Sequence, residues 1–447
     1  MQRFALWLYA LATCLATPLL RAKLRRRALA EPAYGQHVDE RFGHYGPALD
    51  SVQPQAEDER FVWIHAVSLG ETRAAALLLK ELRPLLPGMR LLLTHGTATG
   101  RAEGAALLQP GDVQLWLPWD TPGATRRFVR HFRPAIGILM ETEVWPCLAA
   151  ACRRAGVPLV LANARLNEKS RAGARRLAWL ARPAYSGLTA VWAQTEADAE
   201  RLRSVGAPVA AVLGNLKFDV VPPPAQQAHG RAWRAAATRP VALLASSREG
   251  EEALWLAALQ SNRPPTQAGQ APAAIKTGAT GKLQWLLVPR HPQRFDEVER
   301  LCRAAGLTVS RRSRWTAGPE AADVWLGDSM GEMALYYGLA HVALLGGSFE
   351  RLGGQNLIEA AACGCPVVMG PHTFNFAEAA ELALKAGAAE RVPDMASAVQ
   401  AAAALVLDVP AQARAAGRCL AFAEAHRGGA LATALAIVQQ LRRPTEC

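Results

Sequence analysis

The chain has 447 residues, enough for two or three domains with large cores, and 51% of it is hydrophobic. This composition excludes a disordered or fibrous protein. The formal net charge of +12 favours acidic partners: a phosphorylated substrate, an anionic membrane or nucleic acid. Nucleic acid is the least favoured, because aromatic residues are scarce and no basic segment is interleaved with them. Eight scattered cysteines without a CxxC pair indicate free thiols in a reducing compartment.

The first element is an uncharged apolar run of 17 residues over 4–20, and five basic residues follow it over 21–27. This length lies at the lower limit for a membrane-spanning helix, and the basic cluster would stay on the cytoplasmic side. A signal peptide carries its charges before the apolar run, so we interpret 1–27 as an uncleaved membrane anchor. Spanning the bilayer and lying in its interface both stay open. A polar lead-in follows over 28–60.

Short apolar runs alternate with helical segments over 61–220. The runs are FVWIHAV, LLLT, AIGILM, PLVLAN, AVWAQ and VAAVLGN. This alternation is typical of a parallel sheet that is covered by helices on both faces, as in a doubly wound α/β domain. Three prolines at 222–224 mark a break, and we interpret 221–240 as a linker.

A second α/β pattern occupies 241–425, with the apolar runs VALLASS, WLLVPR, LTVS, DVWLGD and HVALL and a later strand at 366–369. Within it, 261–282 is poor in bulky apolar residues, which predicts a flexible surface insertion. A closing helix is expected within 426–447. Two doubly wound domains would face a central cleft at the carboxyl ends of their sheets, where such sheets bind ligands.

The first strand of the N-terminal domain leads into the motif HAVSLGETRAA. Ser68 and Gly70 form the predicted turn, and Glu71 falls at the start of a helix. A carboxylate in that position can remove a proton from the hydroxyl of an acceptor. The alternative is that Glu71 only stabilises the positive end of the helix dipole.

Two further motifs follow strands of the same domain. ETEVWP places Glu141 and Glu143 two residues apart, and NARLNEKS places Arg165 and Lys169 at a corresponding strand end. No histidine or third acid supports metal chelation by the glutamates, so they either contact an acceptor or cap the strand. The two basic residues are candidates for acceptor phosphates.

In the second domain, VPRHP places Arg290 and His291 at the end of a strand, and ASSREGEE places Ser246 ahead of a helix. The guanidinium suits bidentate phosphate binding, and the imidazole and hydroxyl can add hydrogen bonds. His291 can instead be only a turn residue before Pro292.

The stretch 341–376 reads as a strand, a glycine turn, a helix and a second strand. The turn consists of Gly346, Gly347 and Ser348. Such a turn beside a helix start, expected near Gln355 and Asn356, can offer backbone N–H groups to an anion. Glu359 lies one helical turn after Asn356, where its carboxylate can bind a ribose diol. An ordinary βαβ unit explains the same pattern.

Dinucleotide and P-loop fingerprints are missing, as is the DxD motif of metal-dependent nucleotide-sugar enzymes. Nine motifs occur in order, however: HAVSLGETRAA, ETEVWP, NARLNEKS, GNLKFD, VPRHPQRF, GDSMGEM, LLGGSF, GGQNLIEAA and PVVMGPHTFNF. Together they resemble the 3-deoxy-D-manno-octulosonic acid (Kdo) transferases of lipopolysaccharide synthesis over 61–425. The resemblance implies a GT-B fold, with the acceptor on the N-terminal Rossmann-like domain and the nucleotide sugar on the C-terminal one.

The resemblance further implies inverting transfer of Kdo from CMP-Kdo to a tetraacylated lipid A precursor at the cytoplasmic face of the inner membrane, without metal or cofactor. Glu71 matches the general base of the family. The family positions that bind CMP are matched by Arg290, the turn Gly346-Gly347-Ser348, Asn356 and Glu359, and those near the cytosine by Gly331 and Met333.

This chain departs from the family in two motifs, and its insertion over 261–282 is also unusual for the family. Gln355 replaces a histidine in the pattern GGHNPLEPA, and LTHGTATGR over 93–101 replaces TTMTPTGSE. The first alternative function is another GT-B nucleotide-sugar transferase or epimerase, which would not explain the N-terminal motifs. The second is a catalytically inactive, membrane-tethered GT-B binding protein, which would have no need to keep Glu71.

Overall fold

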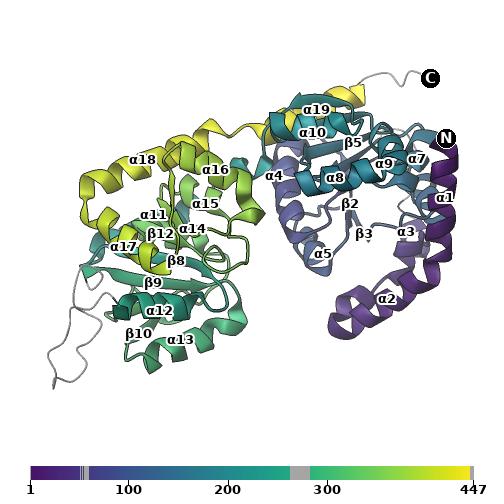
Figure 1. Cartoon of the computed structure of the whole chain (residues 1–447). Helices are drawn as coiled ribbons and strands as arrows, with labels where there is room; N and C mark the ends of the chain where they lie inside the picture. Colours follow the sequence, from purple (N-terminus) through teal and green to yellow (C-terminus); the bar gives the residue numbers. More distant parts are fainter. Residues whose placement is uncertain (1, 51, 53, 55–59, 262–281, 443–447) are drawn as a thin grey trace. The chain divides into compact units, whose positions relative to one another are not determined.

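The computed structural model describes residues 2–50, 52, 54, 60–261 and 282–442 (Figure 1). The predicted insertion lies outside the described residues, apart from its two end positions. The chain divides into two compact units, one made of 1–219 with 427–447 and the other of 220–426. We call them unit 1 and unit 2.

Unit 1 is built on a seven-stranded parallel sheet in the order β3-β2-β1-β4-β5-β6-β7. Six of its strands are the six predicted runs, and the sequence did not predict β3, which has four residues. The strands are β1 (Phe61–His65), β2 (Arg90–His95), β3 (Val113–Trp116), β4 (Ile136–Met140), β5 (Leu159–Ala164), β6 (Ala190–Ala193) and β7 (Val209–Val212).

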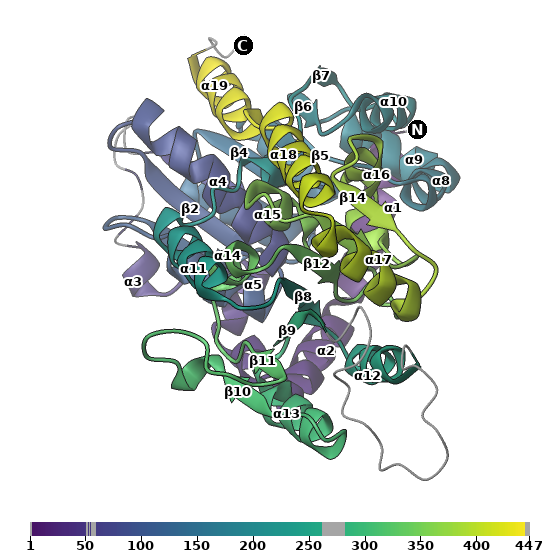
Figure 2. The same ribbon diagram turned by 90° about the vertical axis from the view of Figure 1, so that its left-hand side faces the viewer.

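Helices cover both faces of this sheet, so strands such as β1 are buried at every residue and read as continuous apolar runs. Trp63 packs with Phe128 of α6 on one face, whereas Ile64 packs with Leu78 of α4 on the other. The helices are α4 (Leu69–Leu85), α5 (Ala98–Ala105), α6 (Pro122–Phe132), α7 (Pro146–Arg154), α8 (Glu168–Arg176), α9 (Ala178–Tyr185), α10 (Glu196–Ser204) and α19 (Gly429–Arg442). The closing helix α19 contacts α4, and Figure 2 shows it at the end of the chain.

The predicted N-terminal anchor is not one continuous helix. It is divided at Ala16 into α1 (Gln2–Leu15) and α2 (Thr17–Ala30). Among the described residues no single helix is long and apolar enough to cross a bilayer, and one bent pair near the C-terminus passes by length and composition alone. Helix α1 contacts α7 and α9. The lead-in forms three short helices, η1 (Pro32–Gly35), η2 (Val38–Phe42) and α3 (Pro47–Asp50).

Unit 2 carries a second seven-stranded parallel sheet, in the order β10-β11-β9-β8-β12-β13-β14. The predicted strands are confirmed, and the short β14 was not predicted. The strands are β8 (Val241–Ser247), β9 (Gln284–Pro289), β10 (Val309–Arg311), β11 (Val324–Leu326), β12 (Val342–Leu345), β13 (Val367–Met369) and β14 (Ala389–Arg391). The helices are α11 (Pro224–Ala236), α12 (Glu251–Ser261), α13 (Phe295–Ala304), α14 (Met333–Leu339), α15 (Leu357–Ala362), α16 (Ala377–Lys385), α17 (Met395–Leu407) and α18 (Val409–Ala425).

The interpretation of 221–240 as a linker is wrong for most of its length, because α11 occupies it and contacts α14. A Cβ at Gly230 would lie 2.1 Å from the carbonyl oxygen of Leu335, so the two helices touch closely at this glycine. The last of the three prolines begins the helix. Proline is favoured there because the first turn has no use for its missing N–H.

Asp219 fastens the start of α19 within unit 1. Its carboxylate accepts hydrogen bonds from the N–H groups of Gly428 at 2.6 Å and Ala430 at 2.8 Å. We expect Asp219→Ala to lower the free energy of unfolding by about 1–2 kcal/mol, because it removes a helix cap. Chemical denaturation measures this change, with the exposed Glu196→Ala as the control. A midpoint equal to that of the control would contradict the capping role.

Candidate active site

The predicted acceptor-side residues of unit 1 gather at one edge of its sheet. β1 and β4 are neighbours in the sheet although two strands separate them in sequence, which makes their carboxyl ends a topological switch point. Doubly wound sheets bind ligands at such points. Glu71 lies in the first turn of α4 after β1, and Glu141 follows β4 directly.

Glu71 is held at the start of α4 by its neighbours. Ser68 is the N-cap, and its hydroxyl donates to Glu71 Oε1 at 3.1 Å. The backbone N–H of Val67 donates to Oε2 at 2.8 Å. Gly70 lies in the same first turn. The capping role that the sequence allowed for Glu71 is therefore present, and these bonds fix the direction of its carboxyl group.

The pKa of Glu71 distinguishes it from an ordinary capping carboxylate. Its pKa is raised to about 7. Burial is the largest cause, the nearby charges of Glu141 and Glu143 act in the same direction, and the hydrogen bonds from Val67 and Ser68 oppose the rise. A carboxyl group with a pKa near 7 exchanges its proton readily at neutral pH. Glu71 can therefore both take up and release a proton near neutral pH.

The segment 93–101, where the chain departs from the family pattern, supports the turn in front of Glu71. Thr97 donates its hydroxyl hydrogen bond to the carbonyl of Val67 at 2.9 Å. His95 lies 2.9 Å from the carbonyl of Ala66 through Nδ1, and burial lowers its pKa to about 4. A Cβ at Gly104 would lie 2.4 Å from the His95 ring, so this glycine makes room for it. The departure is thus accommodated locally.

Glu141 belongs to an ion cluster within unit 1. Its carboxylate lies 2.7 Å from Arg165 Nε and 2.8 Å from Lys217 Nζ. Burial alone would raise the pKa of Glu141, but Lys217 and Arg165 outweigh burial and lower it. Lys217 was not predicted, although it lies in the quoted motif GNLKFD just after β7. Glu141 therefore holds two cations at the sheet edge.

The remaining acceptor-side candidates differ in their surroundings. Glu143 is partly buried, and burial raises its pKa. Lys169 is exposed on α8 and forms no hydrogen bond or ion pair with the described residues. The structure brings Glu143 close enough to influence Glu71, whereas no such influence connects Lys169 to the cluster.

In unit 2, Ser246 lies at the end of the central strand β8 with a left-handed φ of 54°, which is unusual for a residue other than glycine. Its hydroxyl is 3.9 Å from the sulfur of Met333 at the start of α14. Gly331 also has a left-handed φ, and a Cβ there would meet no atom within 4 Å. Ser246 and Met333, two of the residues predicted to bind the nucleotide, are therefore in contact, and there is open space beside Gly331, a third.

The glycine turn after β12 forms hydrogen bonds within the protein that the sequence did not predict. A Cβ at Gly346 would lie 2.3 Å from the carbonyl of Ser246, so the turn requires glycine to fit against β8. The N–H group of Gly347 was expected to be open to an anion. It instead donates to the buried carboxylate of Glu251 at 2.7 Å, and the N–H of Phe349, which follows the turn, donates to the same carboxylate at 3.1 Å. The prediction of a free donor is wrong for Gly347.

The hydroxyl group of Ser348 also forms hydrogen bonds within the protein. Its side chain is fully buried, its hydroxyl donates to the carbonyl of Leu345 at 2.5 Å, and its oxygen accepts from the N–H of Gly370 at 2.8 Å. These bonds connect the ends of β12 and β13. Ser348 therefore shapes the turn through its side chain, and any contact with a ligand would use its backbone.

Arg248 lies beside the glycine turn, and its charge acts on His291 at the end of β9. Burial lowers the pKa of His291, and the charges of Arg248 and Arg290 lower it further, so these three groups lie close together. A Cβ at Gly347 would lie 3.2 Å from Gln355 Nε2 and 3.6 Å from Arg248 Cγ. Arg248 was not predicted, although it follows the two serines of ASSREGEE. The cluster offers two guanidinium groups and an amide for a phosphate.

Helix α15 begins as expected, with Asn356 as its N-cap. The Asn356 side-chain oxygen accepts the N–H of Ile358 at 3.0 Å. Glu359 lies one turn later and is partly buried. Asn356 thus has a structural role, and its amide NH2 group is the part available for other contacts.

Two doubly wound units, each built on a seven-stranded parallel sheet, have the architecture of the GT-B class of fold. Solved structures share this fold. The structure of a glycosyltransferase from Rickettsia africae matches with a TM-score of 0.55 at 12% identity, and the match covers 86% of this chain and 99% of that one. The UDP-GlcNAc 2-epimerase from Neisseria meningitidis gives a TM-score of 0.52 at 14% identity, covering 85% and 98%.

Sequence comparison identifies the family. The family model for 3-deoxy-D-manno-octulosonic acid transferase matches residues 36–220. The Bordetella pertussis transferase of that name is 50% identical over 82% of this chain and 84% of its own. The transferase from Haemophilus influenzae is 32% identical over 81% of each chain. The chain belongs to the 3-deoxy-D-manno-octulosonic acid transferase family, and is thus a Kdo transferase of lipopolysaccharide synthesis.

Proposed function

We propose that the protein transfers Kdo from CMP-Kdo to a tetraacylated lipid A precursor, with inversion at the anomeric carbon and without a metal ion. The observation that carries the proposal is Glu71, a fixed carboxyl group at the switch point of unit 1 with a pKa of about 7. An acceptor hydroxyl attacks the anomeric carbon while Glu71 takes its proton. The bond between that carbon and the CMP phosphate oxygen breaks, and the electron pair leaves with CMP.

The residues of unit 2 would bind the donor. Arg248, Arg290 and Gln355 around Gly347 would bind the CMP phosphate and stabilise its charge as the bond breaks. Glu359 would accept hydrogen bonds from the ribose. The open space beside Gly331, together with Ser246 and Met333, would receive the cytosine.

The basic residues of unit 1 would bind the acceptor. Arg165 and Lys217 lie at the same sheet edge as Glu71 and suit the phosphates of a lipid A precursor. We place the enzyme at the cytoplasmic face of the inner membrane, attached through the apolar α1 and the basic residues of α2. A lipid acceptor requires such a position, and each suitably placed basic residue adds about 1 kcal/mol of attraction to anionic lipid.

Incubating the purified protein with CMP-Kdo and the tetraacylated precursor tests the proposal. We expect the acceptor mass to rise by whole Kdo residues, CMP to be released in equal amount, and a chelator to leave the rate unchanged. Transfer from a different nucleotide sugar in place of CMP-Kdo would contradict the donor assignment. A requirement for added divalent metal would contradict the metal-free mechanism.

A further inference from the structure

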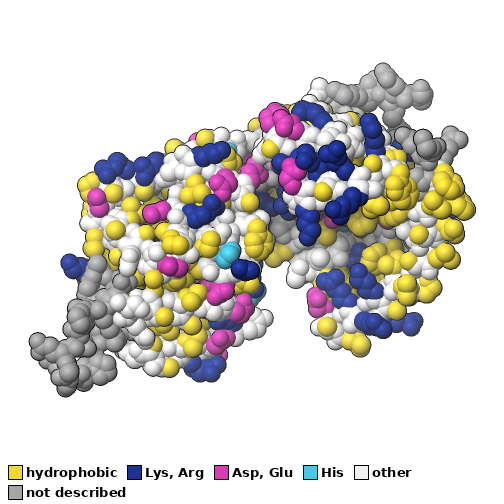
Figure 3. Space-filling view, in the orientation of Figure 1, with side chains coloured by type: hydrophobic (Ala, Val, Ile, Leu, Met, Phe, Trp, Pro, Cys, Tyr) yellow, Lys and Arg dark blue, Asp and Glu magenta, His cyan; other side chains and the backbone are white. Residues whose placement is uncertain are grey.

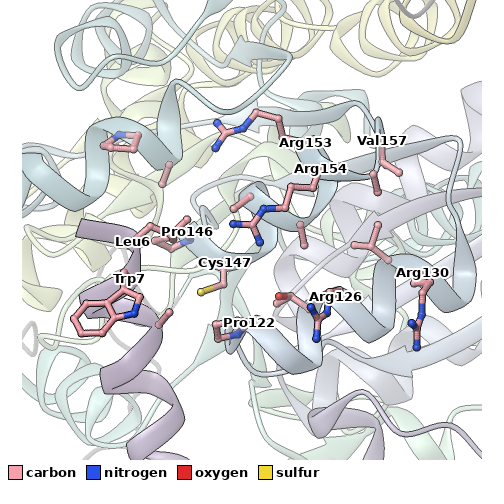
Figure 4. A pocket seen from close by; sticks show the side chains of 18 of the residues that line it. Leu6, Trp7, Pro122, Arg126, Arg130, Pro146, Cys147, Arg153, Arg154 and Val157 are labelled. Atoms are coloured by element: carbon pink, nitrogen blue, oxygen red, sulfur yellow. The ribbon is translucent and has the colours of Figure 1, made fainter. Parts of the chain in front are cut away.

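Unit 1 has a large groove on its surface, and none of the catalytic, donor-side or acceptor-side residues assigned above lines it. The groove has a volume of about 1590 Å³ and lies among α1, α6, α7 and α9. Figure 4 shows Leu6 and Trp7 of α1 at one end, with arginines of α6 and α7 along the rest. A volume of this size is enough for a lipid headgroup with part of its acyl chains.

Charge in the groove is of one sign. The residues that line it include no Asp or Glu among those described, and they include six arginines: Arg60, Arg126, Arg130, Arg133, Arg153 and Arg154. Arg60 and Arg133 donate to backbone carbonyls, at 3.1 Å to Arg133 and 2.7 Å to Pro54. An anionic ligand therefore meets a concentrated positive charge that the lining residues do not neutralise.

The other four arginines come from the two helices α6 and α7, which both line the groove. Arg126 and Arg130 lie one turn apart on α6, so they project from the same side of that helix. Arg153 and Arg154 come from the last turn of α7. All four side chains are exposed, and none forms a hydrogen bond or ion pair with a described residue. They match the oxygens of a phosphate held between the two helices.

The floor of the groove is apolar. It is formed by the buried side chains of Val129, Ala150, Ala151 and Val157, and the small alanines of α7 leave the groove wide. Two tryptophans, Trp7 at 57% exposure and Trp179 at 49%, stand at its rim. Tryptophan prefers the boundary between headgroups and acyl chains, so its place at this rim fits a lipid better than a soluble anion.

Helix α1 extends the apolar surface beyond the groove. Its exposed residues include Phe4, Leu8, Leu11 and Leu15, and Figure 3 shows apolar side chains along the right-hand edge of unit 1, where α1 lies. The helix is fastened to the groove wall, because the Tyr9 hydroxyl bonds to Asp120 and that carboxylate accepts the N–H of Leu148 in α7 at 2.8 Å. An acyl chain leaving the groove would thus stay on apolar surface.

We propose that this groove binds one anionic membrane phospholipid, with its phosphate between the arginines of α6 and α7 and an acyl chain along the apolar floor toward α1. The lipid would hold unit 1 on the membrane by a defined contact, in addition to the nonspecific attraction of the basic α2. The proposal does not depend on which sugar donor or acceptor the enzyme uses.

The test uses the full chain in vesicles of phosphatidylcholine with or without one fifth phosphatidylglycerol. A trace of phosphatidylglycerol with a photoactivatable acyl chain labels the protein, and peptide mass mapping locates the label. We expect labelling of the α6–α7 segment, and a labelling yield about thirtyfold lower in Arg126→Gln/Arg154→Gln, because two phosphate contacts are lost. The control Arg175→Gln/Arg176→Gln, which changes exposed arginines of α8 outside the groove, should keep the full yield.

Three results would overturn the proposal. Equal labelling by a photoactivatable phosphatidylcholine would show that the arginines do not select an anionic headgroup. An unchanged yield in the α6–α7 double variant would show that the label arrives by general membrane contact. Displacement of the label by stoichiometric tetraacylated precursor would assign the groove to the acceptor. Because no transfer is measured, failure of the proposed reaction leaves these results interpretable.

Discussion

Replacing Glu71 by glutamine should lower the rate of Kdo transfer by about two to four orders of magnitude, the range expected for losing a general base. Glutamine has nearly the same shape. Its carbonyl oxygen can still accept from the N–H of Val67, and its NH2 group can donate to the hydroxyl oxygen of Ser68, so the fold of the turn should persist. We expect CMP to bind with unchanged affinity, since the proposed donor residues lie in unit 2. Calorimetric titration with CMP, beside a single-turnover assay, separates the two effects.

The matched control is Glu103→Gln. Glu103 lies on α5 and forms an exposed ion pair with Arg73 of α4, which this change removes. Exposed pairs contribute little, so this variant should keep nearly full activity. Full activity of Glu71→Gln would remove Glu71 from the mechanism. A parallel loss of CMP binding would indicate a structural effect instead of a missing base.

The same carboxyl group sets an expected pH dependence. Burial raises the pKa of Glu71 to about 7. Only the ionised carboxylate, which predominates above this pH, can take a proton from the acceptor hydroxyl. The rate should therefore fall as the pH decreases through about 7, approaching tenfold per pH unit on the acid side, and level off above it. In Glu71→Gln the residual rate should lose this acid limb, which a pH profile of both proteins measures.

Replacing Glu251 by alanine should have the largest effect on stability, about 3–5 kcal/mol. The fully buried carboxylate accepts three backbone N–H groups, from Arg248 at 2.8 Å, Gly347 at 2.7 Å and Phe349 at 3.1 Å. Each buried donor left without a partner costs about 1–3 kcal/mol. Chemical denaturation should therefore show a markedly lower midpoint for unit 2.

The variant Glu251→Ala should also bind the donor more weakly, because Glu251 joins the loop carrying Arg248 to the glycine turn. The control is Glu249→Ala, which removes an exposed carboxylate paired with the same arginine at 3.0 Å and should cost less than about 1 kcal/mol. If Glu251→Ala unfolds at the same midpoint as this control, the three hydrogen bonds do not stabilise the turn as we infer.

The sequence predicted the long strands well and the short edge strands poorly. β1 and β8 are buried at nearly every residue, so their apolar runs are visible without an alignment. β3 has four residues including a glutamine, and β14 reads AER, so neither carries a continuous apolar signal. The helix α11 was missed because prolines at its start resemble a break.

The positions of the site residues were predictable, but many of their bonds were not. Parallel strands end at a common edge, so motifs after them must lie near one another. A local pattern cannot show that Glu251 bonds to Gly347, 96 residues later, or that Lys217 pairs with Glu141 across three strands. Residues distant in sequence have no spacing rule, and the prediction of free N–H donors failed for this reason.

The return of α19 to unit 1 determines the order in which the protein can fold during synthesis. Unit 2 is continuous in the chain, from 220 to 426, and all of its parts are present once that stretch has left the ribosome. Unit 1, which carries Glu71, is complete only after 427–447 has been made. Until then the apolar face of α4 that α19 covers is exposed. The synthesis of unit 1 therefore begins before that of unit 2, but its folding is completed after it.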